Sequence, residues 1–383
     1  MPRFLMMSAL LTAAPLAVAQ PASGLTITCQ ATHGATIAAQ LQGYLISNKM
    51  PPHLLTVEPT TSSAAIATLR IPQESTLQLR DSPYLRNTHP VERHHPTAGT
   101  ILLTSTTEIL AAMLTPGRST ALDLSGASGE CDFSLLTEHL EIRQNITLWS
   151  QKLRWTFPDS TPAVWNPRYW HKGTPLKASV PATVQAFSDV FHNPHHYAIG
   201  CYTATKLVIA QAFLDYYQRV NPQPKKLAQV VRLLWSDNDP LVDIEPYDFW
   251  RFEAHHNHAL PRSPGKLMQQ IPVDSPQHFV PGDWSYFLND HAPSYDRAGY
   301  EGSNALYLGG NRFDDYYADT PAQSYSFEQK IDEVYQWRHG VFSRTRHSHL
   351  LQPMTTPQLH QLARSPANGG LLVPFRLVPK IIR

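Results

Sequence analysis

Cys201 is the residue of this sequence whose type and position best support chemistry. It follows Gly200 and opens a segment, residues 201–217, that is apolar on nearly all sides, as in a helix buried in a core. The start of a helix carries partial positive charge and unpaired N–H groups, which favour a thiolate and can stabilise an oxyanion. Cys201 is therefore a candidate nucleophile for acyl transfer, and an inert buried cysteine is the alternative.

The other two cysteines, Cys29 and Cys131, both lie in the N-terminal half. Residues 1–19 contain Arg3, then an apolar run, and end in Ala17-Val18-Ala19. A basic residue, an apolar run and two small residues separated by one position are typical of a secretory signal peptide and its cleavage site. We therefore predict cleavage after Ala19 and a periplasmic or secreted protein, in which disulfides form. A bond between Cys29 and Cys131 would leave Cys201 as the free thiol.

Charge and length restrict the class of protein. With 31 basic and 30 acidic residues the net charge is +1, and no clustered basic surface favours binding to nucleic acid or an anionic membrane. No apolar stretch reaches the length of a membrane span. A chain of 383 residues is long enough for two domains.

Short Thr-rich, β-branched segments predict strands near residues 25–28, 55–57, 67–71 and 100–104, with short helices at 107–114 and 135–140. Farther along, the pattern predicts helices at 180–190 and 201–217, then strands near 284–287, 304–308 and 313–317. Helices followed by antiparallel strands favour the α+β class. The predicted divisions are a signal peptide at 1–19, a small β-rich module at 20–150, a Pro/Trp-rich connector at 151–178, an enzyme domain at 179–350 and a C-terminal extension at 351–383.

Three motifs occur in order: CYTAT at 201–205, PGDWSYF at 281–287 and GSNALYLG at 302–309. Together they resemble the bacterial protein-glutamine gamma-glutamyltransferase of spore coats, over about residues 195–320, and more distantly the NlpC-type papain-like fold. The resemblance implies a papain-like domain with a buried nucleophile helix and an antiparallel sheet. It also implies a thioester at Cys201, a glutamine acyl donor, a lysine amine as acceptor, and no cofactor or metal.

The general base departs from that family. The family has a glutamate before the nucleophile, here Gly200, and another in a Gly-Glu-Asn motif, here Ser303. Glu301 is the favoured substitute, because residues two apart in a strand share a face. The alternatives are a loop histidine or a domain that binds without catalysis. The histidine candidates are His195, His196, His255, His256, His258 and His291.

Other readings of the sequence stay open. A peptidase or amidase of the same fold would use water as the acceptor and act on proteins or cell-wall peptides. The two His-rich loops lack the spacing of a zinc site. The acidic residues at 314–315 are either a solvated strand end or a group that orients a base.

Overall fold

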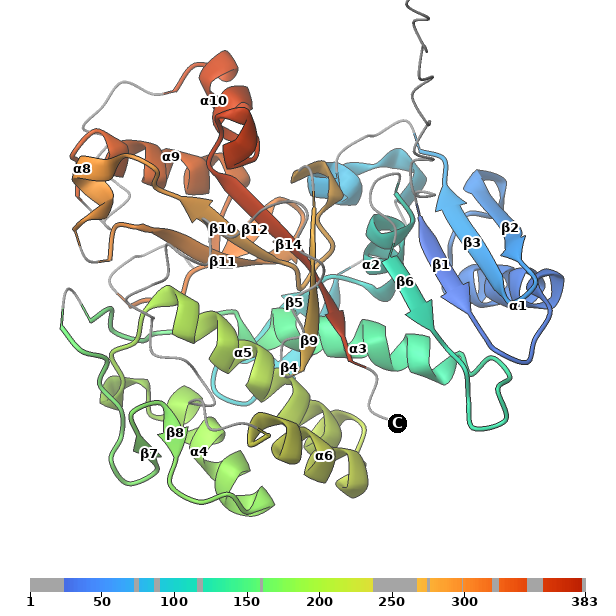
Figure 1. The fold of residues 1–383 in the computed structure, drawn as a ribbon, viewed down its shortest axis with the longest axis horizontal. Helices are drawn as coiled ribbons and strands as arrows, with labels where there is room; N and C mark the ends of the chain where they lie inside the picture. Colours follow the sequence, from blue (N-terminus) through green and yellow to red (C-terminus); the bar gives the residue numbers. More distant parts are fainter. Residues whose placement is uncertain are drawn as a thin grey trace, which may run out of the picture.

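The computed structural model describes residues 24–71, 76–85, 90–115, 120–158, 161–236, 267–273, 276–297, 299–318, 324–342 and 354–380. A four-stranded and a six-stranded sheet dominate this part of the chain, beside two small hairpins. Figure 1 shows the four-stranded sheet on the right, the six-stranded sheet on the upper left, and helix α3 running between and below them. The mixture of helices and sheets confirms the α+β class.

The four-stranded sheet has the order β2-β3-β1-β6. Strand β1 pairs antiparallel with β3 and parallel with β6. Helix α1 packs against this sheet and buries Ile37, Leu41 and Leu45. The sequence reading missed α1, although apolar residues four apart indicate one helix face. The bounds are β1 Leu25–Thr28, α1 Gly34–Ser47, β2 Leu55–Thr61, β3 Ala64–Leu69 and β6 Thr120–Asp123.

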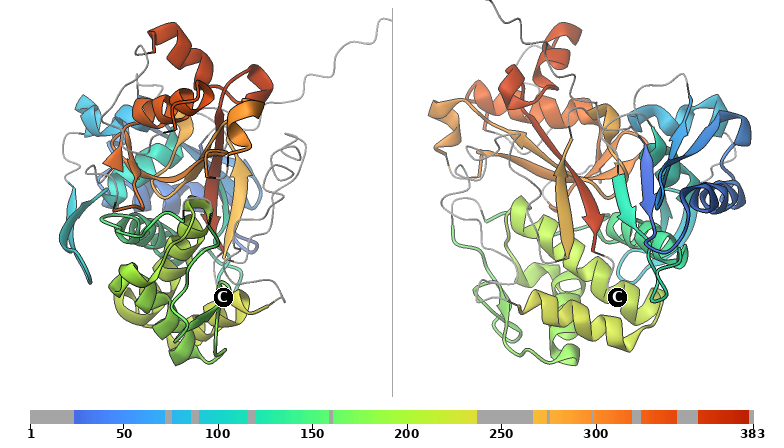
Figure 2. Two further views of the ribbon diagram at one scale, coloured as in Figure 1. Left: turned by 90° about the vertical axis from the view of Figure 1, so that its left-hand side faces the viewer. Right: turned by 45° about the vertical axis from the view of Figure 1, so that its right-hand side comes forward.

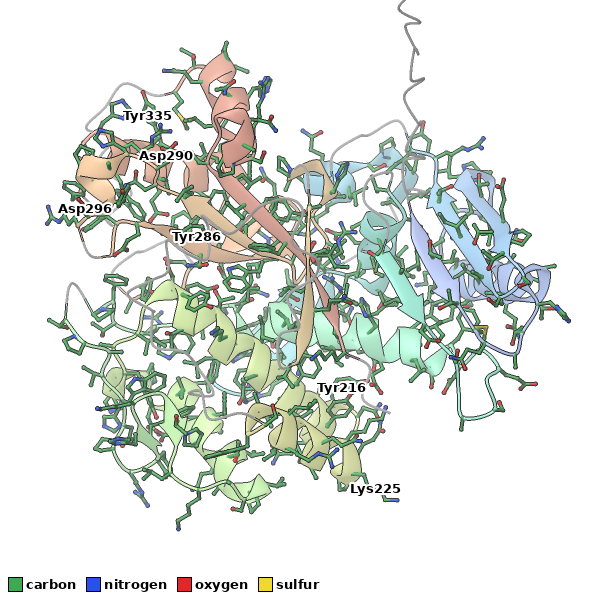
Figure 3. The ribbon with its side chains drawn as sticks, in the orientation of Figure 1. Tyr216, Lys225, Tyr286, Asp290, Asp296 and Tyr335 are labelled. Carbon is green, nitrogen blue, oxygen red and sulfur yellow. A yellow bond between two sulfur atoms is a disulfide. The ribbon has the colours of Figure 1, made fainter. Side chains whose placement is uncertain are left out.

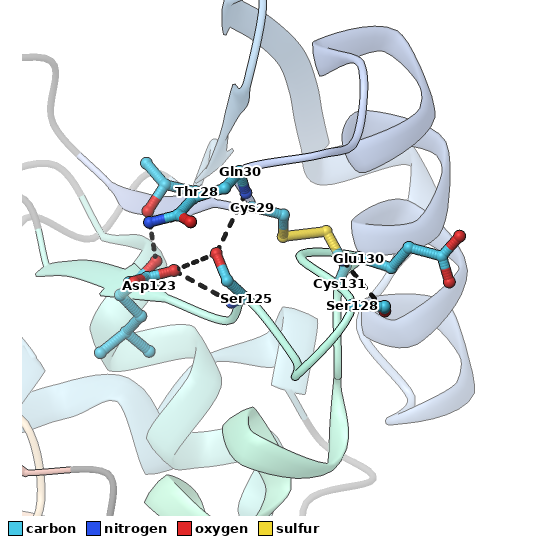
Figure 4. Close-up of a disulfide and its surroundings, with 9 residues drawn as sticks. Thr28, Cys29, Gln30, Asp123, Ser125, Ser128, Glu130 and Cys131 are labelled. Carbon is cyan, nitrogen blue, oxygen red and sulfur yellow. Dashed lines mark hydrogen bonds between the residues drawn. A yellow bond between two sulfur atoms is a disulfide. The ribbon is translucent and has the colours of Figure 1, made fainter. Parts of the chain in front are cut away.

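A disulfide joins Cys29, after β1, to Cys131 (Figure 4). Their Cα atoms lie 5.3 Å apart and the sequence separation is 102 residues. This is the pairing that the sequence left open, and it leaves Cys201 as the cysteine outside a disulfide. Closing a loop of this length stabilises the fold by roughly 4–5 kcal/mol in the chain-entropy model.

The six-stranded sheet has the order β13-β12-β11-β10-β14-β9, and every neighbouring pair is antiparallel. Strand β14 comes from the segment predicted as a C-terminal extension and lies between β10 and β9. The domain limits drawn from the sequence remain predictions. The strand bounds are β9 Met268–Pro272, β10 Trp284–Leu288, β11 Gly302–Gly309, β12 Arg312–Asp314, β13 Ser324–Tyr325 and β14 Leu372–Pro379.

The two faces of this sheet pack against different helices, as Figures 1 and 2 show. Trp284 and Leu306 belong to a core that includes α5 and α3. Phe287 and Ala305 belong to a second core that includes α9. Because side chains alternate along a strand, even-numbered residues near the start of β11 face α5, and odd-numbered residues face α9.

The predicted helices at 180–190 and 201–217 are confirmed as α4 and α5, and a π-helix (Tyr216–Val220) continues α5. Helix α3 extends well beyond the predicted segment 135–140. The remaining bounds are α2 Thr106–Leu114, α3 Ser134–Trp149, α4 Val180–His192, α5 Cys201–Asp215, α6 Pro224–Leu234, α8 Ala292–Tyr295, α9 Phe327–Arg338, α10 Thr356–Leu362, β4 Val91–His95, β5 Gly99–Leu103, β7 Trp170–His171 and β8 Thr174–Pro175.

The turn before β10 ties α3 to the six-stranded sheet through Asp283. This carboxylate is fully buried and pairs with Arg143 of α3 at 3.0 Å and with Arg376 of β14 at 3.3 Å. It also accepts hydrogen bonds from the backbone N–H groups of Val280, at 2.8 Å, and Leu377, at 3.0 Å. Both carboxylate oxygens therefore have partners, as a buried charge requires.

Candidate active site

Cys201 is the first residue of α5, as the sequence predicts. The preceding residue, Gly200, has no side chain with which to cap the helix, and the helix start has no side-chain cap hydrogen bond. The thiol belongs to a free cysteine and is partly exposed. The positive end of the helix therefore acts on a sulfur that a substrate can reach.

Asn304 of β11 donates two hydrogen bonds to this sulfur. Its backbone N–H lies 3.4 Å and its side-chain Nδ2 3.3 Å from Cys201 Sγ. Trp284 Nε1 donates to Asn304 Oδ1 at 2.9 Å. Because the indole N–H can only donate, the amide must turn its oxygen to Trp284 and its nitrogen to the sulfur. Donors directed at a thiolate stabilise the ionised form.

Ser303 lies on the opposite face of β11. Its hydroxyl is 2.6 Å from Lys330 Nζ of α9, and Lys330 forms a buried ion pair with Glu333 at 2.8 Å. The alternation along the strand thus directs Ser303 to α9 and Asn304 to α5. The structure brings Asn304 to Cys201 and engages the side chain of Ser303 elsewhere.

Glu301 precedes β11. Its Oε1 accepts a hydrogen bond from the Gly299 N–H at 2.8 Å. Its carbonyl accepts one from the hydroxyl of Tyr286 at 2.9 Å; Tyr286 is labelled in Figure 3. Because Glu301 lies in a bend before β11, strand alternation does not fix the direction of its side chain, and its carboxylate is hydrogen-bonded to Gly299. Its role as the base remains a prediction.

The histidine candidates divide by position. His255, His256 and His258 lie outside the described residues. His195 and His196 form part of a short 3-10 helix between α4 and α5, and their rings lie 4.1 Å apart. His291 Nδ1 is 3.1 Å from the hydroxyl of Ser294. A histidine base also remains a prediction.

A second polar chain leads away from Cys201 on the inner side of α5. Thr205 donates to the Cys201 carbonyl at 2.9 Å, and its hydroxyl is 2.7 Å from that of Tyr316. Burial raises the pKa of Tyr316 well above its usual value, and the negative charges of Asp314 and Cys201 raise it further. Tyr316 is thus within electrostatic reach of both groups. The sequence reading did not single it out.

Asp314 ends β12 and is 1% exposed. Its Oδ1 accepts a hydrogen bond from the Leu306 N–H at 3.0 Å. In the described part of the chain, its buried Oδ2 has no hydrogen-bond partner. Burial raises the pKa of Asp314 well above its usual value, against the lowering effects of the Leu306 N–H, the Lys330 charge and the Tyr316 hydroxyl. This carboxyl group is therefore buried rather than solvated.

No cluster of three or more His, Cys, Asp and Glu side chains placed to hold a metal ion occurs among the described residues. None of their helices is long and apolar enough to cross a membrane.

Comparisons with known proteins bear on this arrangement. The family model described as protein-glutamine gamma-glutamyltransferase matches residues 131–365, which is more than half of the chain. No curated protein matched the sequence. Among solved structures, the chain is similar to a transglutaminase from Geobacillus stearothermophilus without its C-terminal extension, at 20% identity and a TM-score of 0.32, over 61% of this chain and 99% of that one. By the extent of the family match, the chain belongs to the protein-glutamine gamma-glutamyltransferase family.

Proposed function

We propose that this protein is a cysteine-dependent protein-glutamine gamma-glutamyltransferase with Cys201 as its nucleophile. One observation carries the proposal. A free, partly exposed thiol begins α5 and receives two hydrogen bonds from Asn304. Helix start and donors act in the same direction, because each lowers the free energy of the thiolate relative to the thiol.

In the proposed reaction, the Cys201 thiolate attacks the γ-carboxamide carbon of a glutamine side chain. The C–S bond forms, the C–N bond breaks, and the nitrogen takes up a proton and leaves as ammonia. A lysine amine then attacks the thioester. The C–S bond breaks, the amine gives up a proton, an isopeptide bond forms and the thiolate returns.

Asn304 Nδ2 also suits the role of oxyanion donor. Trp284 fixes the amide orientation through its bond to Oδ1, so the Nδ2 donor is held in place before substrate arrives. Preorganised donors near the reacting carbon stabilise the negative charge that develops on the acyl oxygen. The carbonyl of a glutamine donor bound at the sulfur would lie next to this group.

The fold, the family, the N-terminal sequence and the disulfide support the same proposal. A helix opening with the nucleophile packs against an antiparallel sheet, the arrangement expected of a papain-like domain. Protein side chains follow from the family as the substrate class. The N-terminal sequence and the disulfide support an exported protein with its signal peptide removed after Ala19.

The test incubates the full-length mature protein with a glutamine donor peptide and a fluorescent primary amine. We expect amine incorporation that is lost in Cys201→Ala and also in Cys201→Ser, which replaces the thiol with a hydroxyl group of similar size. Mass spectrometry of the alkylated wild type provides the control, with one modified thiol because the other two cysteines are bonded. Hydrolysis of the peptide without incorporation would favour an amidase or peptidase, and binding without turnover would favour a non-catalytic domain.

A further inference from the structure

We propose that Asp314, acting through Tyr316, holds the proton that the reaction at Cys201 exchanges. This inference rests on the proposed function. It gives Asp314 the acid–base role of the glutamate that the family carries where this chain has Ser303. Three features of the described residues support it: the edge of β11, the hydrogen bonds of Tyr316, and the incomplete pairing of the carboxyl group.

The edge of β11 places the sulfur and the carboxyl group in one row. The Asn304 N–H points to Cys201 Sγ, and the Leu306 N–H points to Asp314 Oδ1. Residues two apart in a strand direct their N–H groups to the same edge, with a spacing of about 7 Å. Such a separation is too long for a direct hydrogen bond, but one bridging group can span it.

The hydroxyl of Tyr316 is in position to act as that bridge. The Thr205 hydroxyl is within hydrogen-bond distance of the Cys201 carbonyl, which can only accept, and of the Tyr316 hydroxyl. In the bond of 2.7 Å between the two hydroxyls, either oxygen can be the donor. Tyr316 also interacts by a hydrogen bond with the side chain of Asp314, so its hydroxyl can donate to the carboxylate and can accept from the protonated acid.

Asp314 is paired incompletely for a buried carboxyl group. Oδ1 has the Leu306 N–H, whereas the buried Oδ2 has no close hydrogen bond among the described residues. The nearby hydroxyl of Tyr316 acts on the carboxyl group and lowers its pKa, but less than burial raises it. A buried carboxylate with so few partners favours its protonated form. Because its pKa is raised, the group favours the acid form, which can give a proton and take it back, as an acid–base catalyst requires.

The charged and titratable groups around Asp314 come from three directions. Lys330 of α9 favours the ionised form and is itself paired with Glu333. Asp315 favours the neutral form and accepts a hydrogen bond from Tyr325 of β13. Tyr316 adjoins the carboxyl group, with Cys201 of α5 beyond it.

The proton balance closes over one turnover. The cycle begins with a thiolate at Cys201 and a protonated Asp314. On acylation, the proton passes by way of the Tyr316 hydroxyl to the departing nitrogen, which leaves as ammonia, and Asp314 becomes a carboxylate. On transfer, the attacking amine returns a proton by the same route while the C–S bond breaks and restores the thiolate.

Asp314→Asn is the decisive variant. The amide oxygen can still accept from the Leu306 N–H, so the structural hydrogen bond is kept while the titrating group is removed. We expect amine transfer to fall by about 100-fold, with loss of one limb of the pH profile of kcat/KM. The matched variant is Asp315→Asn, the adjacent buried aspartate, which keeps the titrating group and should therefore keep this limb, moved to lower pH because the Asp315 charge raises the pKa of Asp314.

Iodoacetamide alkylation of Cys201 provides a readout that needs no turnover. If Asp314 is coupled to the thiol, its conversion to Asn shifts the pH midpoint of alkylation, because the amide cannot carry a negative charge near the sulfur. Absence of amine transfer in the wild type would defeat the proposed function but leave this measurement informative.

An unchanged rate, pH profile and alkylation midpoint in folded Asp314→Asn would overturn the inference. Should that variant fail to fold, Tyr316→Phe decides. It removes the bridging hydroxyl and should lower amine transfer without changing the thermal midpoint by more than a few degrees. A wild-type rate and pH profile in Tyr316→Phe would overturn the inference as well.

Discussion

Two buried aspartates show how differently the same side chain is used in this molecule. Asp283 has an arginine and a backbone N–H group for each of its carboxylate oxygens. Among the described residues, Asp314 has one N–H group on Oδ1 and no arginine, and its Oδ2 has no close hydrogen bond, with the Tyr316 hydroxyl nearby. Full pairing holds a charge in place, whereas incomplete pairing leaves a group that can change its protonation state. The comparison therefore separates a structural junction from a candidate catalytic group.

Replacing Asp283 with Asn tests the structural role of this aspartate and has the largest expected effect on the free energy of unfolding. The substitution leaves Arg143 and Arg376 buried without their negative partner. Breaking a buried ion pair in this way costs about 3–5 kcal/mol. Urea denaturation measures the loss, with Asp314→Asn as the matched control. If the control loses as much stability as Asp283→Asn, the distinction between the two aspartates fails.

The pH dependence of stability tests a second buried group whose role is structural, as that of Asp283 is. Burial lowers the pKa of His95 from its usual 6.5 to about 4, so the unfolded state takes up a proton between these values and the folded state does not. The contribution to stability is complete above pH 6.5 and is lost as the pH falls toward 4, by up to about 3 kcal/mol. Burial also lowers the pKa of His139, which adds to the same trend.

His95→Asn measures this effect. The amide oxygen can replace the ring nitrogen that lies 3.2 Å from the Thr97 N–H, but it does not titrate. Thermal midpoints between pH 7 and 4 should fall less steeply than in the wild type, and exposed His53→Asn serves as the control. Equal slopes in wild type and His95→Asn would assign the acid sensitivity to other groups.

Asn304→Ala changes the candidate active site, and its expected effect, on the activation free energy, is the smallest of these. It removes the Nδ2 donor and keeps the backbone N–H, so one of the two hydrogen bonds to Cys201 is lost. A hydrogen bond to a charged group contributes about 1.5–3 kcal/mol, which predicts a loss of roughly 10- to 100-fold in kcat/KM. The pH midpoint of Cys201 alkylation should rise. Asn304→Asp, which keeps the size but replaces the donor with a negative charge, should raise the midpoint further. An unchanged midpoint in both variants would contradict the role given to Nδ2.

The sequence by itself determined the local features. Alternating and helical patterns located seven of the fourteen strands and four of the nine α-helices in the described part of the chain, and the positions of the cysteines offered Cys29 and Cys131 as a pair. It also placed Cys201 at the start of a buried helix, because that position depends on a short apolar segment and the glycine before it. Three short motifs identified the family.

Tertiary structure decided which groups meet the sulfur. A sequence shows that Glu301 and Ser303 share a face of a strand, but it does not show whether that face packs on α5 or α9. Pairing of β11 with its neighbours and packing of the helices turned Asn304 to Cys201 and Ser303 to Lys330. The sequence offered Asp314 as a solvated or an orienting group. The structure buries it beside β11, with 1% exposed. A sequence does not show this, because desolvation depends on every element packed around a residue.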